Sequence, residues 1–131
     1  MKMGALMQRP VAAATAAENA VITKATLRAA DLLDITARTL ALVIGVSEAT
    51  ISRMRRQEFL LERGTKPFEL AVLFVRLFRS LDAIVGGDET VARAWLKNPN
   101  TTLDGTPLEK ILTIAGLVDV IAYLDSRRAL V

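Results

Sequence analysis

Apolar residues recur along most of the chain at intervals of three and four positions, which is the period of an amphipathic helix. This period predicts a first helix over about residues 23–33 and a second that begins at Thr36, a favourable N-cap. The side chains expected to face inward are Leu27, Ala30 and Leu33 in the first helix and Leu40, Ala41 and Ile44 in the second. No stretch alternates apolar and polar residues between hairpin turns, so we expect an all-α fold without strands.

A longer helix is predicted after Pro67, and it is apolar on nearly all of its faces. Its apolar positions run from Leu70 to Val85, where Gly86 and Gly87 end it. A helix with this pattern must be buried on two sides. We therefore expect either the central helix of one subunit or a contact between two subunits, and the pattern is compatible with both.

The N-terminal end of the chain is predicted to be disordered and the C-terminal part to be helical. Residues 1–21 are rich in alanine and lack an apolar stripe, which predicts a disordered N-terminal arm. Beyond the long helix, Asp88 is expected to cap a short helix that holds Trp95, the only tryptophan. Thr106 and Glu109 have the spacing of a capping box with Pro107 at the first helical position, and they predict further helices to the end.

The composition excludes several kinds of catalytic site, because the 131 residues contain no His and no Cys. Disulfides, thiol nucleophiles, Cys/His zinc sites and imidazole bases are therefore ruled out. An all-carboxylate Mg²⁺ site and a Ser/Lys mechanism stay compatible with the composition. We nevertheless predict a non-enzymatic protein that needs no cofactor and no metal. The length suits one modest domain or two small helical ones. Uncharged runs are shorter than the roughly 18 residues that span a bilayer, so we expect a cytoplasmic protein without a membrane partner.

The net charge of +3 is concentrated in one part of the chain. Residues 23–66 carry eight bases and five acids, and Arg53, Arg55 and Arg56 lie at the centre of this block. A small basic block by itself is commonly just a solvated face. Here the three arginines lie in the second helix of a helix-turn-helix pattern, described next, which favours a nucleic-acid partner instead.

Residues 36–56 fit the requirements of a helix-turn-helix. The motif needs a small residue where its helices cross, a turn residue that accepts positive φ, an apolar plug after it and two inward apolar residues in the second helix. Ala41, Gly45, Val46, Ile51 and Met54 meet these requirements in order. Ser47 is suited to cap the second helix, so we predict a DNA-binding unit whose second helix enters the major groove.

The outward side of that second helix carries the candidate DNA contacts. Arg53 is suited to a bidentate contact with guanine, although a phosphate contact or a solvated position is also compatible with its place. Ser47, Thr50, Arg55 and Arg56 are the candidate phosphate contacts. One such unit neutralises few phosphates, so we expect a homodimer on a palindromic operator.

Residues 86–129 resemble the toxin-binding domain that Xre/MbcA/ParS-type antitoxins share. The residues that carry the resemblance are Gly86-Gly87-Asp88-Glu89, Ala94-Trp95-Leu96, Asn98-Pro99-Asn100, Leu103 and Gly105-Thr106-Pro107-Leu108-Glu109. The upstream helix-turn-helix is similar to that of Xre proteins, so the resemblance covers about residues 23–131. After the disordered arm expected at 1–21, we therefore predict a DNA-binding domain at 22–66, a connecting or dimerisation helix at 67–85 and a toxin-binding domain at 86–131.

The resemblance implies the antitoxin of a RES–Xre toxin–antitoxin pair. Such an antitoxin occludes the active site of a cognate RES-domain toxin, which consumes NAD or transfers ADP-ribose from it, and represses its own operon at its promoter. Tyr123, Asp125, Arg127 and Arg128 are the candidates for the toxin-facing edge, although the two arginines also suit the negative end of a helix. The alternative function is a free-standing dimeric repressor without a toxin partner.

Overall fold

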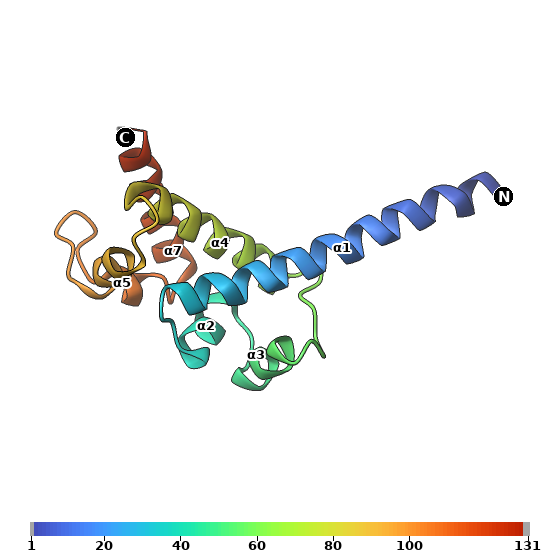
Figure 1. Cartoon of the computed structure of the whole chain (residues 1–131), viewed down its shortest axis with the longest axis horizontal. Helices are drawn as coiled ribbons and strands as arrows, with labels where there is room; N and C mark the ends of the chain where they lie inside the picture. Colours follow the sequence, from blue (N-terminus) through green and yellow to red (C-terminus); the bar gives the residue numbers. More distant parts are fainter. Residues whose placement is uncertain (1, 130–131) are drawn as a thin grey trace.

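The protein is built from helices alone over the residues that this computed structural model describes, which are 2–129 for the backbone and 13–129 for the side chains. The seven helices there are α1 Lys2–Leu32, α2 Ala37–Ile44, α3 Glu48–Arg55, α4 Lys66–Ile84, α5 Glu89–Lys97, α6 Pro107–Lys110 and α7 Ile114–Arg128 (Figure 1). The all-α class predicted from the apolar period is therefore confirmed. Neither α1 nor any other helix in the described part is apolar over a length that would cross a membrane.

The long apolar helix, α4, lies at the centre of the molecule. It packs against α1 and α2 of the N-terminal half and against α7 and α5 of the C-terminal half. Its buried residues are Phe68, Ala71, Phe74, Val75, Leu77, Ser80 and Leu81. The buried side chains of both halves form one continuous cluster around it, from Ala29 to Leu124. The expected burial of this helix on two sides is thus observed within a single chain.

The N-terminal segment differs from the disordered arm predicted for residues 1–21. Residues 2–21 form the first part of α1, which extends away from the body of the molecule (Figure 1). Alanine favours the helix strongly, so an alanine-rich segment needs no apolar stripe to continue one. The loop after α3 also holds this segment: Arg63 donates to the Glu18 carboxylate at 3.1 Å and, through its backbone N–H, to the Asn19 side chain at 3.0 Å.

The helix ends in the C-terminal half follow local capping chemistry with one exception. Asp88 caps α5 as predicted, because its carboxylate accepts from the Val91 N–H at 3.2 Å. Thr106 precedes α6, but its side chain makes no cap hydrogen bond, so the predicted capping box is wrong. Pro107 begins this single turn and lacks an N–H, which leaves fewer unpaired donors for a cap to satisfy.

Candidate DNA-binding and partner-binding surfaces

The turn between α2 and α3 has the geometry that the helix-turn-helix pattern requires. Gly45 adopts φ 73°, a left-handed conformation that costs glycine little. The N–H groups of Gly45 and Val46 both donate to the Ala41 carbonyl, at 2.9 and 3.0 Å, and close α2. Ala41, Ile51 and Met54 are buried where α3 packs against the rest of the N-terminal half. The predicted helix-turn-helix is therefore present.

Three of the predicted DNA contacts form one hydrogen-bonded row along α3. Ser47 caps the helix by accepting from the Thr50 N–H at 3.1 Å, and its hydroxyl lies 3.0 Å from the Thr50 hydroxyl. Arg53 donates to the same Thr50 oxygen at 3.1 Å. Thr50 is only 8 % exposed, so its hydroxyl mainly orients Ser47 and Arg53, both of which are exposed.

Phe59 belongs to this surface although the sequence pattern did not single it out. The Arg53 guanidinium lies over its ring at 5.8 Å from the ring centre, within the range of a cation–π contact. The ring reaches this position because the chain reverses after α3: Gln57 adopts φ 61°, and the Glu58 N–H donates to the Arg53 carbonyl at 2.8 Å. A glutamine in a left-handed turn has no reliable sequence signal, so nothing in the sequence indicated this contact.

The other two predicted contacts are tied to acidic neighbours. Arg55 donates from both terminal nitrogens to the Asp31 carboxylate of α1, at 2.9 and 3.2 Å. Arg56 lies 3.2 Å from the Glu58 carboxylate. Their net positive charge at the end of α3 is therefore smaller than the run of arginines suggests.

The four residues predicted to face a toxin divide between two sides of α7. Tyr123 is half-buried and stacks on Trp95 of α5, with ring centres 6.1 Å apart. Arg127, one helical turn later, lies over the Tyr123 ring at 6.0 Å from its centre. These contacts place an exposed cation beside an aromatic pair at the α5–α7 contact.

Asp125 and Arg128 lie on the side of α7 that faces α4. The Asp125 carboxylate forms an ion pair with Arg76 and accepts from the Ser80 hydroxyl at 3.0 Å. Asp125 thereby joins α7 to α4, so both of its oxygens already have partners. Arg128 lines a groove on this side, together with residues of α4.

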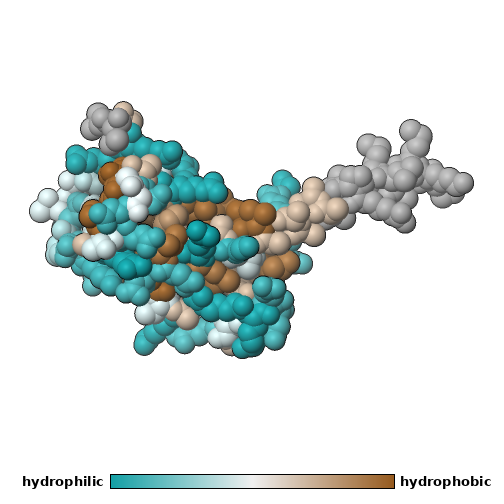
Figure 2. Space-filling view, in the orientation of Figure 1, coloured by the Kyte–Doolittle hydropathy of each residue, from teal (hydrophilic) through white to brown (hydrophobic). Residues whose placement is uncertain are grey.

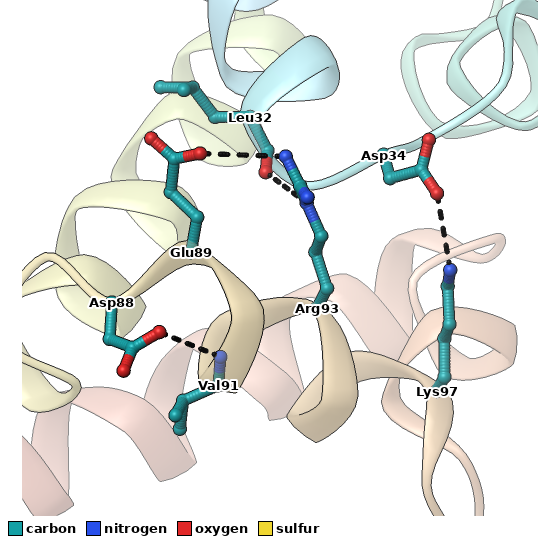
Figure 3. A network of polar contacts seen from close by, with 7 residues as sticks. All are labelled: Leu32, Asp34, Asp88, Glu89, Val91, Arg93 and Lys97. Carbon is teal, nitrogen blue, oxygen red and sulfur yellow. Dashed lines mark hydrogen bonds and ion pairs between the residues drawn. The ribbon is translucent and has the colours of Figure 1, made fainter.

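Polar contacts also join the C-terminal half to the end of α1 (Figure 3). Arg93 of α5 donates through Nε to the Leu32 carbonyl at 2.9 Å and pairs with Glu89 at 3.5 Å. Lys97 pairs with Asp34 at 3.4 Å. The two halves of the chain are therefore also joined directly, through contacts of α5 with the end of α1 and with Asp34.

Comparison with known families identifies both halves of the chain. The antitoxin Xre-like helix-turn-helix domain matches residues 12–76, and the antitoxin Xre/MbcA/ParS C-terminal toxin-binding domain matches residues 80–129. A comparison with individual curated proteins found no match. The domain boundaries expected at residues 22, 67 and 86 stay predictions.

Proposed function

The chain belongs to the Xre-type antitoxins, and on that premise we propose that it neutralises a cognate RES-domain, NAD-consuming toxin and represses its own operon. The observation that carries the proposal is the succession of a DNA-binding and a toxin-binding domain within one chain. Neutralisation is by occlusion of the toxin's active site, which requires a fitted surface and no catalysis by the antitoxin. Because the toxin and the operator DNA are both intracellular partners, we infer that the protein acts in the cytoplasm.

The DNA-binding half acts as a homodimer on a palindromic site in its own promoter. The exposed row of Ser47 and Arg53, oriented through Thr50, supports a DNA contact by α3. The second copy is proposed because one such unit neutralises few phosphates. Arg53 is the base-reading residue because its guanidinium is held by Thr50 and Phe59 and is not neutralised by a carboxylate among the described residues. Ser47 contacts a phosphate beside it, while Arg55 and Arg56 approach the backbone with part of their charge already balanced.

The toxin-binding half presents two arginines at the C-terminal end of α7. Arg127 and Arg128 are exposed on different sides of the helix, one beside Tyr123 and one beside α4. A guanidinium suits a pocket lined with hydrogen-bond acceptors, such as one that holds a dinucleotide. Asp125 contributes by fixing α7 on α4 rather than by contacting the toxin.

The proposal is tested by expressing the adjacent reading frame in a host with and without this protein. We expect growth arrest and a fall in cellular NAD when the neighbour is expressed alone, and rescue of both by co-expression. Arrest at constant NAD with rescue would retain the antitoxin and replace NAD consumption with ADP-ribosylation. Absence of toxicity from an intact, expressed neighbour would contradict the antitoxin proposal and favour a free-standing repressor.

A further inference from the structure

A groove of about 720 Å³ lies where α1, α4 and the end of α7 meet. Its apolar lining comes from Ile22, Val72, Val75 and Ala129, and Val72 is 39 % exposed. On the face in Figure 2, apolar surface is continuous where α1 crosses α4, and hydrophilic residues border it. The groove therefore offers apolar contact area that the residues described by the structure leave uncovered.

The edge of the groove has an excess of positive charge. Arg76, Arg79 and Arg128 line it, against a single acid, Asp125. Asp125 pairs with Arg76, whereas Arg79 and Arg128 form no hydrogen bond or ion pair with any residue that the structure describes. Two guanidinium groups without a partner among the described residues thus border an apolar surface, and each can bind a carboxylate in a bidentate manner.

We propose that this groove binds an acidic segment of the toxin, one that carries apolar side chains between its carboxylates. The inference rests on the proposed antitoxin function, and charge complementarity decides the class of occupant. The carboxylates pair with Arg79 and Arg128 while the apolar side chains cover Val72 and Ile22. The groove takes its residues from both family domains, so the toxin contacts α4 and α1 as well as the toxin-binding domain.

The groove is tested with the full-length chain and the purified product of the adjacent reading frame. The double variant Arg79→Glu/Arg128→Glu places carboxylates at the groove. The matched control is Arg28→Glu/Arg38→Glu, which changes the net charge by the same amount at two exposed arginines that do not line the groove. All four residues are exposed, so both variants are expected to unfold at temperatures close to that of the wild type.

We expect the groove variant to bind the toxin at least tenfold more weakly than the wild type in calorimetry, and the control to bind within about threefold of it. The wild-type affinity is also expected to fall as salt is raised, more steeply than that of the groove variant, because exposed charges are screened. Equal affinity of the groove variant and the wild type would overturn the proposal and leave the antitoxin function standing. A neighbour that does not bind the wild-type chain would instead overturn the antitoxin function itself.

A second copy of the chain is the competing occupant, and the same variants identify it. If the groove variant changes the oligomeric state in analytical ultracentrifugation while toxin affinity stays the same, the groove is a subunit contact and the proposal is wrong. An unchanged oligomeric state with weakened toxin binding supports the acidic segment.

Discussion

Arg53, Arg55 and Arg56 each carry one positive charge at the C-terminal end of α3, yet each has a different environment. Arg53 contacts a hydroxyl and an aromatic ring, whereas Arg55 and Arg56 face the carboxylates of Asp31 and Glu58. An arginine that already pairs with a carboxylate gains less from a phosphate, because it must share or give up that partner. Their contributions to DNA binding are therefore expected to be unequal.

Arg53→Ala is expected to weaken operator binding by about 1–3 kcal/mol and to relax specificity at one base position. Arg55→Ala removes a side chain whose charge Asp31 partly balances, so a smaller loss that is uniform across sequences is expected. The measurement is fluorescence anisotropy with a labelled fragment of the chain's own promoter, with Arg79→Ala on α4 as a control for loss of one positive charge. An Arg55→Ala variant that loses more affinity than Arg53→Ala would contradict the assignment.

At Gly116, packing against a neighbouring segment outweighs the intrinsic preference of helices for alanine over glycine. It is buried in the first turn of α7, and a Cβ there would lie 1.8 Å from the Lys110 carbonyl oxygen. Alanine normally stabilises a helix relative to glycine by roughly 0.5–1 kcal/mol. Here the α6–α7 connection must shift to admit the methyl group. Alanine at this position is therefore expected to destabilise the protein rather than to stabilise it.

Gly116→Ala is accordingly expected to lower the free energy of unfolding by about 1–3 kcal/mol, the usual cost of overpacking. Urea unfolding followed by circular dichroism measures it, with Ala115→Ser at the neighbouring exposed position as the control. A Gly116→Ala variant more stable than the wild type would show that the close approach of Lys110 does not exist in solution.

Among the helices, those defined by local rules were predictable and those held by distant partners were not. The corner between α2 and α3 followed from Ala41, Gly45 and Ser47, because its requirements lie within a few consecutive residues. The helix of residues 2–21 was not predicted, because the apolar period on which the prediction relied is missing there, and its contact with Arg63 at Glu18 and Asn19 joins residues more than forty positions apart.

The same distinction explains how much of the candidate surfaces could be predicted. The sequence identified α3 and its outward arginines, since helical spacing determines which residues lie outside. It did not indicate that Asp31 binds Arg55 or that Arg76 binds Asp125, because these pairs join residues 24 and 49 positions apart. The groove of Arg79 and Arg128 was missed for the same reason, since α4 and α7 come together only in the folded chain.

The N-terminal and C-terminal halves are held together by α4, because helices of both halves pack against it. Phe74 is fully buried in the cluster that spans both halves. Removal of its ring leaves a cavity in the cluster that both halves share. Damage at this site is therefore expected to affect DNA binding and toxin binding together.

Phe74→Ala is expected to destabilise the whole chain by about 3–5 kcal/mol, whereas Val72→Ala, on the exposed side of the same helix, should cost far less. Urea unfolding followed by Trp95 fluorescence reports on the C-terminal half, and far-ultraviolet circular dichroism reports on all helices. The two transitions are expected to coincide in the wild type and in both variants. Separate transitions would show that the halves fold independently.

The continuity of α4 has a consequence for how relatives of this protein exchange parts. The two family matches end at residue 76 and begin at residue 80, so the border between the domains lies inside this helix and no linker separates them. A recombinant that joins the DNA-binding domain of one antitoxin to the toxin-binding domain of another must preserve the helical register across that border. It must also supply buried residues that fit both parents. New combinations of operator and toxin are thus limited by packing around one helix, and the two specificities are expected to be inherited together.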